Sequence, residues 1–428
     1  MKRSTLLPGL AARFARRLPD ITTVRAPYQA AVLRIGLAAV CLAFLLREWP
    51  NRHVLYGNRS PLSHDLARIL VEEEHSFTVL LRSDGQLWFE TVYTLATAAA
   101  VAVLLGWRTR TMSVLLMVCM LSLENRNSLV GDGGDNVLRI MVIYLVLTRC
   151  AEVWSLDARR ARRRERDRAA DDGGAGPARG PWAAFDVPGL VLWALAPTPL
   201  LALSGHSPRG WSVALWTLWA VLGVWYVADR WFPRHEARAV LDAAASMLHN
   251  AAMLAVAAQV CLIYATAGWY KIQGSRWQEG SALHYVLHLD YFAPWPALSG
   301  FLASQTLLVL ALTYGTVMVQ VAFPFTLAHR KLKNVLLAVM ILEHLGISVV
   351  LGIPLLSLSM IVCDAVFLPT GLLMALGARC ARLPLPARVP APRDADREPD
   401  RDADRDADRE SDRTSDRTSD RDGATTSS

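Results

Sequence analysis

The chain has 428 residues, 53% of them hydrophobic, and a mean hydropathy of +0.26. Its apolar residues exceed the roughly 45–50% of a soluble domain and gather in runs, which argues against a single water-soluble core. The formal charge of +7 hides an acidic end, since residues 393–422 hold 8 Arg and 13 Asp or Glu, leaving 37 basic and 25 acidic residues elsewhere. That excess lies in short segments between apolar runs, so it indicates membrane topology and excludes nucleic-acid binding as its explanation.

The first region, residues 1–27, is basic. Leu7, Leu10, Phe14 and Leu18 recur there at helical spacing, which predicts a short interfacial helix. No small-residue cleavage site follows the first apolar run, so that run is expected to be retained as a span.

Apolar runs dominate residues 28–376 and are each typical of a transmembrane helix, although the third is short against the roughly 20 residues that a bilayer requires. They are Gln29–Leu46, Gln86–Gly106, Thr111–Leu123, Asn136–Trp154, Val187–Ser204, Trp211–Ala228, Ala243–Tyr270, Ser304–Leu327, Asn334–Leu351 and Pro354–Leu376. The sequence therefore predicts an all-α fold, a polytopic transmembrane helical bundle of about ten spans.

Basic residues alternate between the loops. They concentrate near residues 108–110, in an Arg-rich linker at 157–180, and near 230–238, 330–333 and 379–382, whereas the intervening loops have no strong basic excess. The positive-inside rule then predicts a multi-pass plasma-membrane protein with both termini cytoplasmic. The Asp/Arg repeats of residues 377–428 contain almost no apolar residue, which predicts a disordered tail.

Two loops carry clustered polar residues on the predicted outer side. The first contains Asn125, Arg126, Asn127, Asp132 and Asp135. In a simple structural interpretation, Asp135 is the N-cap of the next helix and the two preceding glycines form the turn. That interpretation does not explain why Asn125, Arg126 and Asn127 lie close to membrane depth.

The second cluster surrounds Lys271, with Tyr264 before it and Trp277 after it, and His344 lies in the middle of a later apolar run. Lys271 is either an anchor that snorkels to the headgroups within an aromatic belt or a reactive amine, and His344 is either functional or makes a helix–helix hydrogen bond. We predict that Lys271, Asn125, Asn127 and His344 line one outward-facing cavity, with the remaining residues of both clusters as further lining.

Other ionisable residues within the apolar runs are assigned no chemistry and are expected to pair with one another: Arg34, Glu90, Arg139 and Asp364. The six cysteines form no CxxC pair, so neither a metal site nor a disulfide framework is expected. No P-loop or Ser-His-Asp arrangement is present.

At these residues the chain resembles the HTTM family, the horizontally transferred transmembrane domain related to vitamin K-dependent gamma-carboxylase. Four stretches carry the resemblance: Arg34-Ile-Gly to Leu55-Tyr-Gly57, Asn125-Arg-Asn to Trp154-Ser-Leu-Asp157, Tyr264 to Gly280-Ser-Ala, and His344-Leu-Gly-Ile to Phe367-Leu-Pro369. It is also similar to the multi-pass B component of sporulation-delaying toxin maturation.

The carboxylase resemblance implies Lys271 as a base acting on reduced quinone of the vitamin K or menaquinone type, with a peptide or small molecule as the final substrate. This chain differs from the carboxylase in having Arg126-Asn127-Ser128 where the enzyme has a His after its Asn pair, and in lacking a large extracytoplasmic domain. The second resemblance implies a non-catalytic membrane factor that assists maturation or export of a small secreted peptide. The lipid bilayer is the expected partner in both cases.

Overall fold

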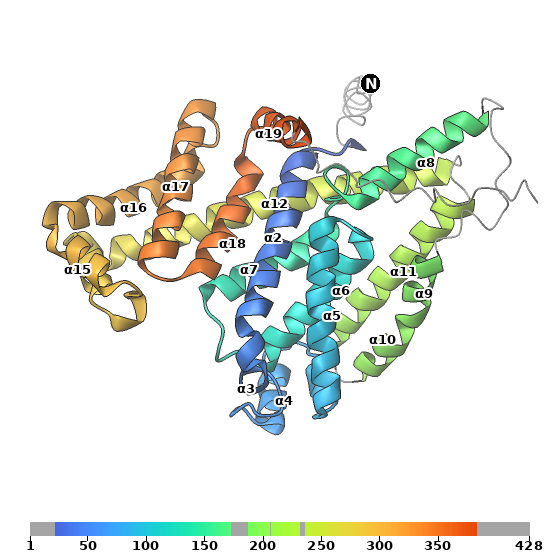
Figure 1. Cartoon of the computed structure of the whole chain (residues 1–428), viewed down its shortest axis with the longest axis horizontal. Coiled ribbons are helices and arrows are strands. Elements are labelled where there is room, and N and C mark those ends of the chain that lie inside the picture. Colours follow the sequence, from blue (N-terminus) through green and yellow to red (C-terminus); the bar gives the residue numbers. More distant parts are fainter. Residues whose placement is uncertain (1–21, 173–186, 206, 232–235, 383–428) are drawn as a thin grey trace, which may run out of the picture. The chain divides into compact units, whose positions relative to one another are not determined.

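The computed structural model describes residues 22–172, 187–205, 207–231 and 236–382, and every regular element within them is helical (Figure 1). This confirms the predicted all-α class. The chain divides into two compact units, Met1–Ala375 and Leu376–Ser428, and the features discussed below lie in the first. The predicted interfacial helix at the N-terminus and the acidic repeats of the tail lie outside the described residues.

The helices of the first half are α2 (Pro27–Glu48), η1 (Trp49–Asn51), α3 (Arg52–Leu55), α4 (His64–Glu73), η2 (Leu80–Arg82), α5 (Gln86–Leu105), α6 (Thr109–Arg126), α7 (Gly133–Leu147), α8 (Leu156–Asp172), α9 (Val187–Leu195) and α10 (Pro197–Ser204). Those of the second half are α11 (Arg209–Trp231), α12 (Glu236–Gln273), α13 (Ser275–Gln278), α14 (Ala282–Leu287), η3 (Asp290–Phe292), α15 (Pro296–Ser304), α16 (Thr306–Thr326), α17 (Arg330–Val350), α18 (Pro354–Asp364), η4 (Ala365–Phe367) and α19 (Thr370–Arg382). The first half of the Arg-rich linker is therefore helical, as α8.

Six of these helices are long and apolar enough to cross a membrane: α2 with its short continuation to Leu55, α5, α11, α12, α16 and α17. Residues Pro354–Phe367 and Thr370–Cys380 add a seventh only if taken as one span, which bends by 110°. The expected count of about ten is not confirmed. At 15 residues α7 is short for a span, and the run near 187–204 is broken at Pro197, which begins a new helix.

The core of the first unit surrounds α2, which packs against α5, α7 and α18 (Figure 1). In the most apolar stretch of α2, 61% of the stretch is buried inside the protein. The corresponding buried shares are 22% for α16 and 17% for α17. Large apolar side chains such as Leu307, Phe325 and Leu342 face outwards on these two helices. The outer helices thus present an apolar surface suited to lipid, as the sequence predicts for a membrane protein.

Arg34 connects α2 to the end of α5 and to the connection between α7 and α8, and it is completely buried. Its guanidinium donates to the carbonyls of Val103 and Leu104 at 2.6 and 2.7 Å, of Cys150 at 3.2 Å and of Trp154 at 2.7 Å. The first two belong to the last turn of α5, where helix carbonyls have no partner within the helix. We call this set of bonds the arginine clasp.

The Trp-Ser-Leu-Asp stretch completes the clasp. The Asp157 carboxylate accepts from the backbone N–H groups of Arg108 and Thr109 at 2.9 and 2.8 Å and from the Thr109 hydroxyl at 2.8 Å, which satisfies free donors at the start of α6. Gly106 has φ of +68°, and a Cβ there would lie 2.4 Å from the Cβ of Ser155. A side chain at this position is therefore excluded by both conformation and space.

Helix α12 is 38 residues long and runs across the first unit (Figure 1). Its buried His249 is held from two sides, because Nδ1 accepts from the Arg149 backbone N–H at 3.0 Å and Nε2 lies 2.8 Å from the Arg25 carbonyl. With Nδ1 acting as acceptor, the proton of a neutral ring lies on Nε2. This holds α12 about a third of the way along its length, far from Lys271.

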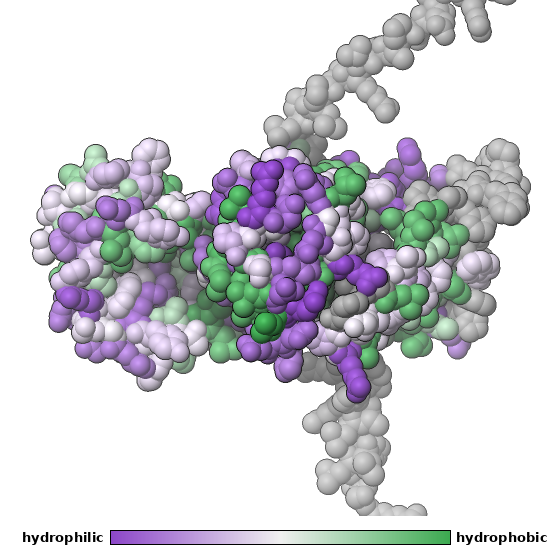
Figure 2. Space-filling model, turned by 90° about the horizontal axis from the view of Figure 1, so that it is seen from below, coloured by the Kyte–Doolittle hydropathy of each residue, from purple (hydrophilic) through white to green (hydrophobic). Residues whose placement is uncertain are grey.

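Residues 49–85 between α2 and α5 form a polar cover over one end of the unit. They include α3 and α4, which lie together at the bottom of Figure 1. Figure 2 views the molecule from that side and shows hydrophilic residues gathered in the middle of this face.

Candidate functional site

Lys271 ends a chain of hydrogen bonds that crosses three helices. Its Nζ donates to Gln320 Oε1 on α16 at 2.8 Å, and Gln320 Nε2 donates to Glu343 Oε1 on α17 at 2.8 Å. The amide of Gln320 is thereby oriented, with its oxygen towards the amine and its nitrogen towards the carboxylate. Lys271 Nζ also lies 5.3 Å from the centroid of the Trp277 ring.

A close approach of α12 and α16 makes this chain possible. Gly268 lies one turn before Lys271, and a Cβ placed on it would be 2.6 Å from Cγ2 of Val321 and 3.3 Å from the Val321 nitrogen. Val321 follows Gln320 directly. The absence of a side chain at Gly268 therefore sets the spacing at which Lys271 reaches Gln320.

A second buried hydrogen-bonded chain joins Tyr264, His344 and Asp364. The Tyr264 hydroxyl donates to Asp364 Oδ2 at 2.9 Å and lies 3.1 Å from His344 Nε2. A hydroxyl has one proton, so His344 must donate from Nε2 if Tyr264 donates to Asp364. His344 Nδ1 and Asp364 Oδ1 then remain buried without a partner among the described residues.

These two chains form one polar group, which we call the lysine group: Lys271, Gln320, Glu343, Tyr264, His344 and Asp364. Tyr264 and Lys271 are two turns apart on α12, and Glu343 and His344 are consecutive on α17. Ionisable residues within the apolar helices of a membrane protein are costly, so the lysine group is the candidate functional site.

The asparagines lie elsewhere, beside a cleft of about 630 Å³ that we call the asparagine cleft. Its lining does not include Lys271 or His344. The lining residues are Phe44, Tyr56, Glu74, His75, Ser76, Leu121, Glu124, Asn125, Asn127, Ser128, Gly131, Asp132, Asp135, Asn136, Arg139, Ile140, Ile143 and Trp211. Among the described residues, the predicted site residues are thus divided between two polar regions, the lysine group and the asparagine cleft.

Asn125, Arg126 and Asn127 hold the polar cover in place. Asn125 Nδ2 donates to the Phe77 carbonyl at 2.8 Å, Arg126 to that of Leu62 at 3.1 Å, and Asn127 to that of Leu55 at 2.7 Å. All three side chains are buried. Their placement near membrane depth, which a simple hairpin left unexplained, therefore has a structural reason: they satisfy backbone carbonyls of residues 55–77.

Asp132, rather than Asp135, caps helix α7. Asp132 accepts from the backbone N–H groups of Gly134 and Asp135 at 2.6 and 3.3 Å, and Asp135 accepts from that of Asp132 at 2.8 Å, which makes a capping box. Burial raises the pKa of Asp135 above its usual range. Gly133 and Gly134 are the first helical residues, and a Cβ on Gly134 would lie 2.8 Å from the backbone of Leu356 on α18. Gly134 therefore serves close packing with α18, and both glycines lie in the helix and not in the expected turn.

The ionisable residues expected to pair with one another have other partners. Arg34 binds carbonyls, as described above. Glu90 accepts from Arg52 at 2.8 Å, Arg139 lies 3.4 Å from Asn125 Oδ1, and Asp364 accepts from Tyr264. Each of the four has a structural partner, but none pairs with another of the four, so the predicted pairing is wrong.

Sequence reasoning did not single out Gln320 and assigned no role to Asp364. Gln320 is a buried amide in the otherwise apolar run of α16, which was the available signal. Its importance depends on Lys271 and Glu343, which lie far from it in the sequence.

The chain matches no protein-family model, no curated protein and no solved structure. Within the described ranges no group of His, Cys, Asp and Glu is arranged to hold a metal ion.

Proposed function

We propose that the chain is a polytopic plasma-membrane protein of the HTTM type, in which the lysine group carries acid–base chemistry with Lys271 as the base. The hydrogen-bonded chain from Lys271 through Gln320 to Glu343 is the observation that supports this proposal. A lysine that served only as an anchor would need no buried amide and carboxylate behind it.

Lys271, Gln320 and Glu343 have separate roles in the proposed proton transfer. A neutral amine that donates one N–H to Gln320 keeps its lone pair free to accept a proton from a substrate. Gln320 holds the amine in position. The carboxylate of Glu343, one amide away, stabilises the ammonium ion that results.

A reduced quinone is the cofactor that the family resemblance implies. The surroundings of Lys271 fit an aromatic compound that arrives from the bilayer, since Trp277 lies beside the amine and the neighbouring Trp269 and Tyr270 side chains are exposed. When bound, the quinol supplies an ionisable hydroxyl. The final substrate in this proposal is a peptide or small molecule.

Substitution of Lys271 by Arg tests the base directly. Arg also snorkels but stays protonated, so Lys271→Arg should abolish complementation of a gene deletion while the protein still inserts normally. The matched control is Lys331→Arg, at an exposed lysine of α17. Full complementation by Lys271→Arg would refute the base role. Extraction and mass analysis of lipids from the purified protein should show retained quinone.

The alternative is a non-catalytic factor for maturation or export of a small secreted peptide. The asparagine cleft favours it, because a polar cleft of about 630 Å³ has room for a short peptide segment. Under this alternative Lys271→Arg complements fully, no quinone is retained, and substitutions in the cleft lining abolish function.

The proposed topology places both termini in the cytoplasm and Lys271 near the outer surface. Cysteine introduced at Ser207 or Ser281 should react with a membrane-impermeant thiol reagent in intact cells. Labelling at Gly173 instead would overturn the orientation.

A further inference from the structure

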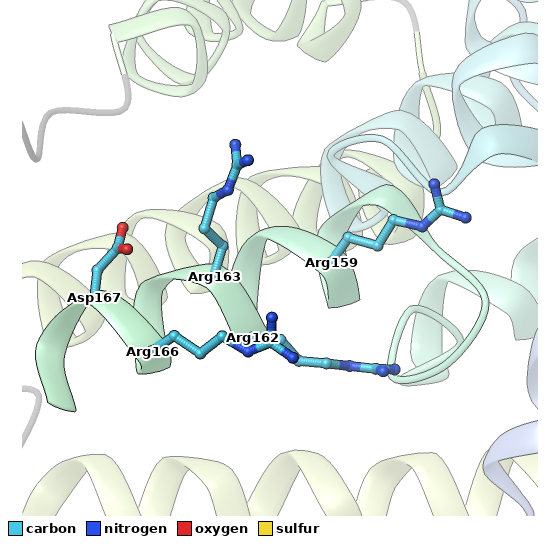
Figure 3. Close-up of a pocket in the computed structure, with 5 residues that line it drawn as sticks. All are labelled: Arg159, Arg162, Arg163, Arg166 and Asp167. Atoms are coloured by element: carbon cyan, nitrogen blue, oxygen red, sulfur yellow. The ribbon is translucent and has the colours of Figure 1, made fainter. Parts of the chain in front are cut away.

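Helix α8 carries four arginines on one stripe. Arg159, Arg162, Arg163 and Arg166 follow the i, i+3, i+4, i+7 spacing, which places them on a single helix face. They surround a hollow of about 420 Å³ together with Asp167 (Figure 3). In that view Arg162 and Arg166 extend along the helix in the same direction. We call these four residues the arginine stripe.

The stripe differs from other arginines nearby. Arg110 and Arg238 both stack on Trp225, with the guanidinium carbons 3.7 and 4.6 Å from the ring centroid, and Arg149 pairs with Glu152 at 2.7 Å. By contrast, the stripe side chains are exposed, and within the described residues none of the four makes an ion pair. Like charges at these spacings repel one another, so the arrangement favours a bound anion.

The start of α8 is held at the end of a membrane helix. The Asp157 backbone N–H donates to the Gly106 carbonyl at 3.0 Å, and Gly106 directly follows α5, one of the candidate spans. The Asp157 carboxylate caps α6 on the same turn. This anchoring places the stripe within about 15 Å of the end of α5, at 1.5 Å per helical residue. If α5 crosses the bilayer, the lipid headgroups lie at the level of the stripe.

We propose that the arginine stripe binds the phosphate of an anionic phospholipid headgroup. Guanidinium groups bind phosphate oxygens through paired N–H donors, and basic clusters beside a membrane helix recognise acidic lipids. The source of the anion is the bilayer itself. This site is independent of the lysine group and of any reaction there.

The stripe has a matched control on the same helix. Arg162→Gln with Arg166→Gln removes two charges from the stripe, whereas Arg160→Gln with Arg164→Gln removes two charges from outside it. Binding of phosphatidylglycerol and of phosphatidylcholine would be measured for each detergent-purified, full-length variant by native mass spectrometry. Thermal stability measured in parallel would confirm that all variants remain folded.

The unsubstituted protein should retain phosphatidylglycerol in preference to phosphatidylcholine. The stripe variant should lose about tenfold in phosphatidylglycerol affinity, as expected for losing charge-assisted contacts, and the control variant less than twofold. Equal losses in the two variants would overturn the site in favour of a general positive surface. Equal retention of both lipids, or displacement of the lipid by inorganic phosphate or an acidic peptide at the same concentration, would overturn the lipid assignment.

Discussion

The spacing of α12 and α16 gives a direct test of how the lysine group is built. Gly268→Ala would place a methyl carbon 2.6 Å from Cγ2 of Val321, against an ordinary apolar contact of about 3.5 Å or more. Because valine has essentially one side-chain rotamer in a helix, the helices themselves must separate, by about 1 Å. The 2.8 Å bond from Lys271 to Gln320 would then lengthen beyond hydrogen-bonding distance.

Overpacking of this kind costs about 1–3 kcal/mol of stability. The stability assay is thermal unfolding of the purified protein. The site assay is the rate at which an amine-reactive reagent acylates Lys271, quantified by mass spectrometry against Lys331 in the same molecule. We expect Gly268→Ala to lower the unfolding temperature and to increase acylation of Lys271, since the amine is no longer held by Gln320.

Two further variants make the test decisive. Gly315→Ala, on α16 at a glycine with no atom within 4 Å of the added methyl group, should change neither measurement. Gly268→Ala combined with Val321→Ala removes the clashing branch and should restore both. If Gly268→Ala leaves the reactivity of Lys271 unchanged, then the close approach of the helices does not position the amine.

Three other perturbations have clear expected outcomes. Arg34→Met leaves four carbonyls without their buried donor and should lower the free energy of unfolding by more than about 4 kcal/mol, seen as loss of folded protein in detergent. Arg34→Lys should lose less stability than Arg34→Met. Wild-type stability of the Met variant would contradict the arginine clasp. Asp132→Ala removes the capping box of α7 and should cost about 1 kcal/mol in thermal unfolding, whereas Asp132→Asn should cost less. Deletion of all residues after Pro392 should leave membrane accumulation unchanged, because that sequence has almost no apolar residue to contribute to a core; loss of the truncated protein from the membrane fraction would show this to be wrong.

Apolar runs were enough to predict the long apolar helices, but neither their continuity nor the polar helices α4 and α8. Hydropathy measures how much apolar surface a segment has. It does not show where a helix is interrupted, as it is before Pro197 and at the bend that follows Phe367. On α6, Arg110 stacks on Trp225 and Arg126 donates to the Leu62 carbonyl, and no local sequence pattern reveals these distant contacts. The number of spans was therefore the least predictable part of the fold.

The candidate site was likewise only partly predictable from the sequence. Polarity within the apolar runs drew attention to Asn125, Asn127, Lys271 and His344, and each of these residues makes a specific hydrogen bond to a distant part of the chain. What each bond does was not predictable, since the partners are dozens of residues away. The asparagines bind backbone carbonyls of a loop, and Lys271 and His344 bind side chains of other helices.

The length of α12 has a mechanical consequence. At 1.5 Å per residue the helix extends about 57 Å, nearly twice the hydrocarbon thickness of a bilayer, and His249 holds it about 33 Å from Lys271. If α12 tilted about His249 as a rigid rod, a tilt of about 5° would move Lys271 by about 3 Å. That displacement equals the length of the bond from Lys271 to Gln320. A small tilt of α12 relative to α16 would therefore be enough to disconnect the amine.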